Sequence, residues 1–377
     1  MGRIKCERNI SYDERRDLYY VYMDLGSDAT GQRCRQYRTY SNLNAARKAL
    51  RQFTTDRDRQ NAVPRSPVTL EDWLERWMHQ IVIPNRAETT VYGYRKIIDN
   101  HIVPMLGDIP LQRLAPSDLQ DYYASLMMEK ELTANTVRRH HDLLSAALHS
   151  AVRQDLLLHS PTDRVEPPHV IPHEARFYNS EDLKRLYGLL KGHPLELAAH
   201  LAASLGLRRE EMCGLHWGSV DFELRKIHIR EARTTAGAKV IAKETKNHSS
   251  TRVLHMGDDI FHLLRRERTR QYELKLSMGP RWPECGLVLV DKNGDPEAPN
   301  LLTMRFSNFV RSKGLPPITL HGLRHSFATV ASAQGVPLFD ISKALGHSTP
   351  ATTGRIYTHL VDQLHTGALD AVAAALR

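Results

Sequence analysis

The sequence predicts a multidomain α+β protein: a small β-sheet plus a helix, then an all-α domain, then a mainly α domain with a small antiparallel β-sheet. Two observations carry this prediction, and the first is length. A chain of 377 residues is too long for one compact core. The second is composition, because proline-bearing stretches at 61–67 and 161–174 separate segments of different periodicity. We therefore expect domains at residues 1–62, 67–160 and 175–377.

The first segment has the pattern of strands followed by a helix. Residues 18–24 (LYYVYMD) and 34–40 (CRQYRTY) are rich in Tyr, Val and Thr and are separated by a polar stretch, which predicts antiparallel strands. A short helix follows in SNLNAARKALRQF, with Ser41 or Asn42 placed to cap it. The sequence thus predicts a β-β-α unit.

Three arginines, Arg33, Arg35 and Arg38, lie at or near the second of these strands. They could form the solvated, charged edge that an exposed strand needs. They could equally belong to a small sheet that enters a DNA groove. The sequence leaves both interpretations open.

The next segment predicts a bundle of amphipathic helices. TLEDWLERWMHQI, which starts at Thr69, places Leu70, Trp73, Leu74 and Trp77 on one face. Three more segments follow with Thr, Ser or Asn starts: TTVYGYRKIIDNHIVPML, PSDLQDYYASLMM and TANTVRRHHDLLSAALHSAV. Basic residues fall on their expected polar faces: Arg95, Lys96, Arg138, Arg139, His140 and His141. Such residues suit contact with DNA phosphates, and they are also what any helix bundle shows to water.

Charge and cysteine usage narrow the class of protein. The formal net charge of +9 is compatible with a polyanionic partner. The charged N-terminus lacks the apolar region of a secretion signal, and no apolar run approaches the roughly 18 residues of a membrane span. The four cysteines have no C-x-x-C spacing. We expect a cytoplasmic protein with reduced thiols, no zinc site and no membrane segment.

Four short segments after residue 175 carry reactive side chains. In ASLGLRREEMCGLHWGSVDF, Arg208 directly precedes a buried helical face, which can hold its head toward a cleft. KVIAKETKNHSSTRVLHM (239–256) predicts two short strands joined by a polar turn around Asn247 and His248. A hairpin tip of this kind can carry Lys243 or Lys246 into a substrate groove.

The other two segments supply histidines, an arginine and a tyrosine. In HGLRHSFATVASAQGV, His321 and Arg324 lie at i, i+3 and face the same way on a helix. LGHSTPATTGRIYTHL holds His347 and, ten residues later, Tyr357. His321 and His325 also form an i, i+4 pair, but the glutamate of the H-E-x-x-H zinc pattern is missing. We therefore expect no metal and no cofactor.

Together these groups are what metal-free transesterification at a phosphodiester requires. Two guanidiniums match the charge that develops on the non-bridging oxygens of the transition state, and they stay protonated at any working pH. A tyrosine hydroxyl needs a base such as histidine to accept its proton. A lysine can protonate the leaving deoxyribose oxygen.

These segments resemble the tyrosine recombinases, also called phage integrases. GLRREEMCGLHWGSVDF is similar to the family's first box, G-L-R-x-x-E-(L/M)-x-x-L-x-W, and HGLRHSFAT with LGHSTPATTGRIYTH to its second. The resemblance implies that Arg208 and Arg324 clamp the scissile phosphate and that His321 acts as acid/base. It implies that His347 hydrogen-bonds the phosphate, and that Tyr357 attacks to give a 3′-phosphotyrosyl link and a free 5′-hydroxyl.

The resemblance assigns two further residues. KNHSSTRVL is similar to the family's hairpin K-T-x-x-S-x-R-x-I, which makes Lys246 the general acid. Asn247 departs from the usual Thr and Lys243 lies on the same arm, so Lys243 stays a second candidate. Glu211 would support its neighbours without reacting.

The resemblance also implies an organisation and a set of partners. The three expected domains correspond to an arm-type DNA-binding β-β-β-α domain, a helical SAM-like core-binding domain and a catalytic domain. An arm domain favours the integrase of a phage or an integrative, conjugative element over a simple Xer-type resolvase. Such enzymes integrate and excise DNA as homotetramers through a Holliday junction. They bind double-stranded core and arm sites within the nucleoid, with an excisionase and a host DNA-bending protein as candidate partners.

Two questions stay open at this level. The tail after Tyr357 is amphipathic, and could pack on a neighbouring protomer or on its own domain. A type IB topoisomerase and a non-catalytic DNA-binding protein are the rival functions. The arm-like domain disfavours the topoisomerase, and the six reactive residues disfavour the binding protein.

Overall fold

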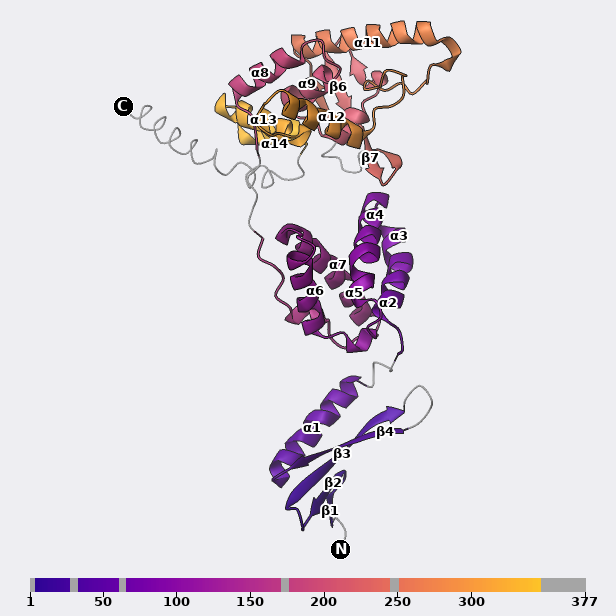
Figure 1. The fold of residues 1–377 in the computed structure, drawn as a ribbon, viewed down its shortest axis with the longest axis vertical. Helices are drawn as coiled ribbons and strands as arrows, with labels where there is room; N and C mark the ends of the chain where they lie inside the picture. Colours follow the sequence, from indigo (N-terminus) through magenta and orange to yellow (C-terminus); the bar gives the residue numbers. More distant parts are fainter. Residues whose placement is uncertain (1–3, 28–32, 61–65, 171–175, 245–250, 347–377) are drawn as a thin grey trace, which may run out of the picture. The chain divides into compact units, whose positions relative to one another are not determined.

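The computed structural model describes residues 4–27, 33–60, 66–170, 176–244 and 251–346 (Figure 1). The chain divides into two compact units, 1–172 and 173–377. The first unit holds two separate hydrophobic cores, one under the N-terminal sheet and one among helices.

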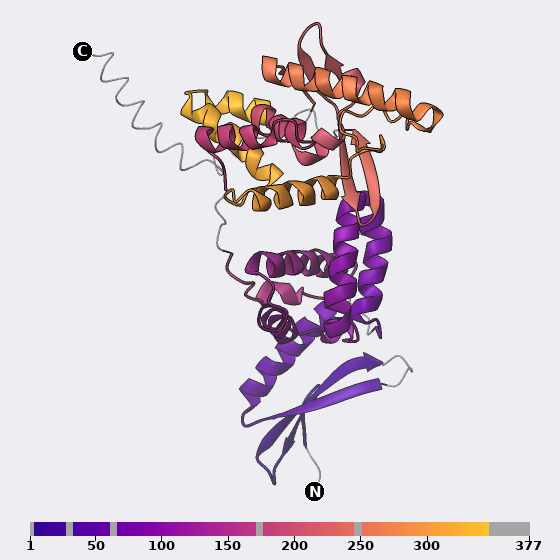
Figure 2. The ribbon, with the colours of Figure 1, turned by 45° about the horizontal axis from the view of Figure 1, so that its top comes forward.

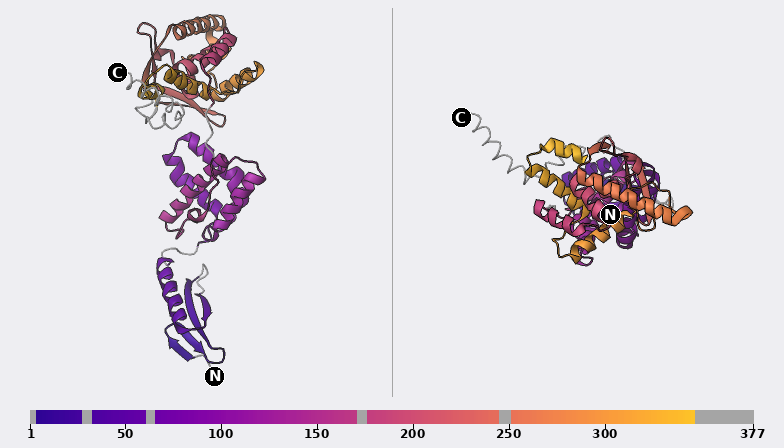
Figure 3. Two further views of the ribbon diagram at one scale, coloured as in Figure 1. Left: turned by 90° about the vertical axis from the view of Figure 1, so that its left-hand side faces the viewer. Right: turned by 90° about the horizontal axis from the view of Figure 1, so that it is seen from above.

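The N-terminal part is a four-stranded antiparallel sheet with one helix along a face (Figures 1 and 3). Ile10, Val21 and Met23 of the sheet pack with Ala46 of the helix. Asn42 is the residue that caps this helix, because its Oδ1 accepts the backbone N–H of Ala45 at 2.7 Å. In sheet order, the elements are β1 (Ile4–Glu7), β2 (Ile10–Asp13), β3 (Leu18–Ser27) and β4 (Arg33–Tyr40), followed by α1 (Leu43–Gln60).

The two strands and the helix expected here are confirmed, but the sheet has two strands more than the sequence predicted. β1 and β2 have the sequences IKCE and ISYD, four residues each, without the Tyr- and Val-rich pattern of β3. β2 is stabilised by pairing, since Ile10 lies opposite Val21 and joins the core, and β1 pairs with β2. Runs this short carry too little pattern to be recognised as strands.

The helical part of the first unit forms four main helices, as expected. Thr69 and Asp72 form a capping box, and the predicted face of Leu70, Trp73 and Trp77 is buried. The first two helices each contain a π-helical turn just before a proline, which removes the backbone donor the ladder would need. Figure 2 shows these two long helices side by side. The segments are α2 (Leu70–Trp77), η1 (Met78–Val82), α3 (Ile83–Asn85), α4 (Glu88–Ile97), η2 (Ile98–Ile102), α5 (Val103–Leu106), η3 (Leu111–Arg113), α6 (Pro116–Met128), α7 (Ala134–Arg153) and η4 (Pro161–Arg164).

The prediction of a linker at residues 161–174 is partly wrong. Pro161 starts the short helix η4, and both Pro161 and Thr162 are buried. Val165 belongs to the hydrophobic core of the helices. The prolines were therefore misleading at this point, because proline also suits the first turn of a helix. Residues 61–65 of the other linker lie outside the described residues.

The second unit is mainly helical with two small antiparallel sheets, which confirms the expected fold class. One sheet has the order β5-β6-β9, and β7 and β8 form a separate ribbon. Helix α11 runs along one side of this unit (Figure 3). The elements are α8 (Ser180–Leu190), α9 (Glu196–Leu205), α10 (Arg209–Cys213), η5 (Trp217–Ser219), β5 (Val220–Asp221), β6 (Lys226–Ile229), β7 (Glu231–Ala236), β8 (Lys239–Glu244), β9 (Arg252–His255), α11 (Asp258–Met278), η6 (Gly279–Arg281), α12 (Pro299–Ser312), α13 (Leu320–Ala333) and α14 (Leu338–Leu345).

The two strands expected within 239–256 exist, but their pairing differs from the prediction. β8 pairs with β7, and β9 pairs with β6, so the two do not form one hairpin ladder. The described hairpin turns instead at Gly237, whose φ of 63° suits a tight two-residue turn. The expected turn around Asn247 and His248 lies outside the described residues.

Candidate active site

The turn between α9 and α10 places the first arginine. Helix α9 ends at Gly206, which has a left-handed φ of 64°. This backbone conformation strains any residue with a side chain, and a Cβ here would lie 2.7 Å from a methyl group of Leu345, so glycine is favoured. Leu207 is fully buried and anchors the turn, and Arg208 then occupies the N-cap of α10. The G-L-R motif thus fixes the backbone from which the Arg208 side chain leaves.

Arg208 is held at both ends of its guanidinium. Its Nη1 donates to Glu211 Oε1 at 2.8 Å, and its Nη2 donates to the carbonyl of Gly346 at 3.1 Å. The side chain keeps 31% of its surface exposed. A partly exposed, rigidly held guanidinium can receive an anion from solvent.

Arg324 lies deeper in the same cluster. It projects from α13 and is 1% exposed. Its guanidinium donates to the carbonyls of Gly206 and Leu345, and its Nη1 lies 4.0 Å from Glu211 Oε2. The two arginines expected to act together therefore share Glu211 and the end of α14.

Glu211 is the anion at the centre of the cluster. Its side chain is 3% exposed, and its Oε2 also accepts the backbone N–H of Arg208 at 2.9 Å. Burial alone would raise the pKa of this carboxyl. Hydrogen bonds and positive charge from Arg252 and then Arg208 outweigh burial and lower the pKa to about 2. Glu211 is therefore ionised at any pH at which the protein works.

His321 and Arg324 both lie on α13, in the expected helical relation. Burial by surrounding atoms, followed by the positive charge of Arg324, lowers the pKa of His321. His325 follows one turn later, with its ring edge-on to His321 at 4.7 Å between centroids. The pKa of His325 falls to about 4 through burial and then the charge of His321. Both imidazoles are neutral at pH 7, as a proton acceptor must be.

Arg252 is a member of the cluster to which the sequence analysis gave no role. It projects from β9 and donates from Nη1 and Nη2 to the two oxygens of Glu211, at 3.0 and 2.8 Å. Its Nε donates to the carbonyl of Ala344 at 2.7 Å. The signal was present, because Arg252 is the arginine of the segment KNHSSTRVL.

The remaining expected reactive residues are not placed by the structure. Lys246, His347 and Tyr357 lie outside the described residues. Lys243 belongs to β8, where its backbone lies opposite Ala232.

The basic residues expected on the helical polar faces divide into three kinds. Lys96, Arg138 and Arg139 are exposed. Arg95 is already engaged, because its Nη2 donates to Glu75 at 2.9 Å. His140 and His141 are buried and half-buried, respectively.

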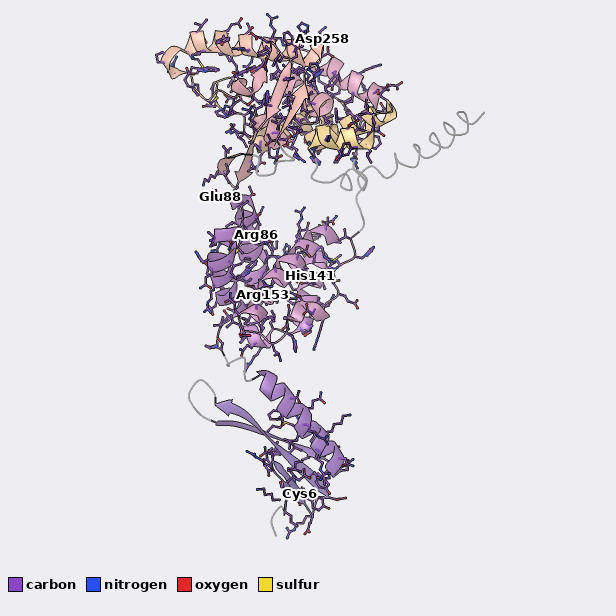
Figure 4. All side chains as sticks on the ribbon, turned by 180° about the vertical axis from the view of Figure 1, so that it is seen from behind. Cys6, Arg86, Glu88, His141, Arg153 and Asp258 are labelled. Atoms are coloured by element: carbon purple, nitrogen blue, oxygen red, sulfur yellow. The ribbon has the colours of Figure 1, made fainter. Side chains whose placement is uncertain are left out.

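His140 was expected on a polar face and is instead 1% exposed. Its Nδ1 lies 2.8 Å from the hydroxyl of Tyr122, which satisfies the buried ring. His141, labelled in Figure 4, is half-buried and pairs in the same way with the Tyr123 hydroxyl at 3.1 Å. His140 therefore belongs to the interior of the helices, whereas His141 keeps part of its surface exposed.

The three N-terminal arginines all lie on β4. In the strand register, Arg33 pairs with Ser27 and Arg35 with Asp24. Arg38 is exposed and pairs with Val21, a core residue on the side of the sheet that α1 covers.

Among the described residues, no group of three His, Cys, Asp or Glu side chains could hold a metal ion. No helix in the same residues is long and apolar enough to cross a membrane.

Comparison of the sequence with known families agrees with this geometry. The phage integrase family matches residues 176–363, and the phage integrase N-terminal SAM-like domain matches residues 69–127. The chain is 26% identical to a tyrosine recombinase XerC-like protein of Caldanaerobacter subterraneus, over 94% of this chain and 95% of that one. It is 25% identical to the ICEBs1 integrase of Bacillus subtilis, over 91% and 93%.

Solved structures share the fold. The Tn1549 transposon integrase, in complex with transposon right end DNA, matches 81% of this chain and 99% of its own, with a TM-score of 0.67 and 20% identity. A lambda integrase dimer bound to a COC′ core site matches 94% and 96%, with a TM-score of 0.56 and 16% identity. From the site geometry and these relatives, the chain belongs to the phage integrase family, the tyrosine recombinases that cut and rejoin DNA.

Proposed function

We propose that this protein is a site-specific recombinase that integrates and excises a mobile element through a covalent bond between Tyr357 and DNA. One observation carries the proposal most directly. Arg208 and Arg324 are fixed together around Glu211, with His321 on the same helix as Arg324. Phosphodiester transesterification without a metal needs such a pair of guanidiniums next to a proton acceptor.

The proposed reaction begins at a phosphodiester held by Arg208 and Arg324. The hydroxyl oxygen of Tyr357 attacks phosphorus, and its proton passes to His321. The bond from phosphorus to the 5′-oxygen breaks, and Lys246 gives that oxygen a proton. The products are a 3′-phosphotyrosyl bond and a free 5′-hydroxyl.

Rejoining runs the same steps in reverse with the 5′-hydroxyl of another strand. That hydroxyl attacks the phosphotyrosine, the Tyr357 oxygen leaves, and His321 returns the proton. One phosphoester replaces another in each step, so no ATP is consumed. His347 donates a hydrogen bond to the phosphate, and Lys243 is the alternative to Lys246 as the acid.

Strand exchange requires more than one copy. We propose a homotetramer on two DNA sites, which exchanges one pair of strands at a time through a Holliday junction. The amphipathic tail after Tyr357 would pack on a neighbouring protomer or on its own domain. Truncation after His365 separates these two arrangements, because only packing between protomers makes assembly on DNA depend on the tail.

DNA recognition is proposed for both parts of the first unit. Residues 67–160 would bind the core site, with Lys96, Arg138 and Arg139 exposed to phosphates. Residues 1–62 would bind arm sites through the sheet that carries Arg33, Arg35 and Arg38. The complexes of the Tn1549 and lambda integrases with DNA support a DNA partner. An excisionase and a host DNA-bending protein are proposed as accessory partners, and the nucleoid as the place of action.

Likeness to the ICEBs1 integrase and to phage integrases supports a mobile element as the origin of the gene. The test is a plasmid that carries two attachment sites from the ends of such an element. Purified protein should recombine the two sites into products of defined length. Relaxation of supercoiled DNA without site preference would instead indicate a type IB topoisomerase. Binding without any recombination would indicate an accessory DNA-binding protein.

A further inference from the structure

Three guanidiniums meet three consecutive carbonyls at the end of α14. Arg252 Nε donates to Ala344, Arg324 Nη2 to Leu345 and Arg208 Nη2 to Gly346, at 2.7, 2.6 and 3.1 Å. The carboxyl end of a helix carries unpaired carbonyls and a partial negative charge, which cations stabilise. His347 is the next residue of the sequence, and Tyr357 follows ten residues later. The cluster therefore holds the point from which the proposed nucleophile segment departs.

Arg252 differs from the other two arginines in what it can touch. Its side chain is 7% exposed, against 31% for Arg208. All three nitrogens of its guanidinium donate to protein acceptors: Nη1 and Nη2 to Glu211, and Nε to the carbonyl of Ala344. Any effect of Arg252 on the scissile phosphate must therefore pass through its neighbours.

Glu211 is the neighbour through which it can act. This carboxylate accepts two hydrogen bonds from Arg252 and two from Arg208, one of them from the backbone. A bidentate arginine fixes the plane of a carboxylate as well as its position. Arg252 thus determines where the Glu211 oxygens lie, and these oxygens determine where Arg208 can lie.

We propose that Arg252 is a positioning residue of the recombination reaction, which aligns Arg208 through Glu211 and fixes the start of the Tyr357 segment through Ala344. The inference rests on the proposed function. A lysine cannot replace Arg252, because a single ammonium group cannot serve a flat carboxylate and a carbonyl in three fixed directions. Its loss should affect the rate of cleavage far more than the affinity for DNA.

The experiment compares Arg252→Lys with the unaltered full-length protein. The rate of covalent adduct formation is measured in single turnover, on a nicked attachment-site DNA that traps the adduct. We expect the rate to fall by about 10²-fold, because small displacements of aligned groups have effects of this size. The dissociation constant for the same DNA should change by less than about threefold. Arg305→Lys is the matched control, since Arg305 binds the buried Glu297 at 2.9 Å in the same unit, from a helix that carries none of the cluster's residues.

A second substrate separates positioning from loss of folded protein. A methylphosphonate at the scissile position lacks the negative charge that Arg208 and Arg324 would stabilise. If Arg252 acts by placing those guanidiniums, the rate defect of Arg252→Lys should shrink at least tenfold on this neutral substrate. The comparison uses one preparation for both substrates, so the folded fraction cancels.

The possible results are distinct. Equal defects on both substrates, an equal loss of rate in Arg305→Lys, or a full rate in Arg252→Lys would each overturn the positioning role. These comparisons can be interpreted only if the unaltered protein forms the adduct. If the unaltered protein forms none on a verified site, the proposed function itself fails.

Discussion

Each unit of the chain contains a cluster of buried polar side chains, and the two clusters satisfy the hydrogen bonds of these side chains with different chemical groups. Among the helices of the first unit, Tyr122 bonds His140 at 2.8 Å and Tyr123 bonds His141 at 3.1 Å. In the second unit, Glu211 binds Arg208 and Arg252. Both clusters bring together groups from separate elements, and both are largely shielded from water.

The protonation states separate the two clusters. Burial, followed by the charge of His101, lowers the pKa of His140 to about 4, and burial raises the pKa of Tyr122. Those groups are therefore neutral and satisfy one another. In the second unit, Glu211 stays ionised and three guanidiniums share it. A neutral cluster is complete in itself, whereas the charged one keeps an excess of positive charge for a phosphate.

The largest expected effect comes from Arg324→Lys. The lysine ammonium group keeps the positive charge, but it lacks the planar set of N–H donors with which a guanidinium can bind both carbonyls and the phosphate at once. Adduct formation should fall by about 10³-fold, the range seen when one transition-state donor is lost. The rate is measured in single turnover on a nicked attachment site. A rate within tenfold of the unaltered protein would contradict the assigned role.

Glu211→Gln should lower the stability of the second unit by about 3–5 kcal/mol, because it removes the carboxylate that binds these three guanidiniums. Urea unfolding of the full chain measures this loss. Acid should have a matching effect, since the folded pKa of about 2 lies below the ordinary 4.5. The stability that Glu211 contributes is therefore present above about pH 4.5 and disappears as the pH falls toward 2. A Glu211→Gln protein that keeps the same acid dependence would argue against this assignment.

His140 should make the stability of the first unit depend on pH. Its folded pKa of about 4 lies below the ordinary 6.5, so the unfolded chain binds one more proton between these values. Stability should be complete above about pH 6.5 and decline as the pH falls toward 4. With Trp217 and Trp282 replaced by Phe, the fluorescence of Trp73 and Trp77 reports this unit alone. His140→Gln should remove that slope without changing the rate of adduct formation at pH 7.

The smallest effects are expected at the surface of the first unit. Lys96→Gln and Arg139→Gln should each weaken DNA binding and reduce the salt dependence by about one counterion. Arg95→Gln should do less, because Arg95 already pairs with Glu75. Dissociation constants across a range of salt concentrations give these slopes. An effect of Arg95→Gln as large as the other two would show that the ion pair opens on DNA.

The sequence predicted the helical parts of this fold well because their signals are local. The face of Leu70, Trp73 and Trp77 repeats within one helix, and His321 and Arg324 are three residues apart. Arg208 and Glu211 are equally close, so their contact follows once α10 forms.

The parts that were missed depend on partners far away in the chain. β9 pairs with β6 rather than with β8, and the sequence of a short strand does not indicate with which strand it pairs. His140 was predicted to lie on a polar helix face, and it is buried where its ring forms a hydrogen bond with the Tyr122 hydroxyl, 18 residues away in the chain. Arg252 bonds Glu211 and Ala344 at separations of 41 and 92 residues. Long-range hydrogen bonds of this kind give no periodic pattern.

The central claim is that Tyr357 attacks DNA within a cluster of fixed guanidiniums. The most direct measurement incubates the protein with a nicked attachment-site DNA in the presence of a chelator, then digests the product and identifies the peptide attached to DNA. We predict an adduct on the peptide that contains Tyr357, and none with Tyr357→Phe. An adduct on another residue, an adduct that survives Tyr357→Phe, or tight binding to a verified site without any adduct would contradict the claim.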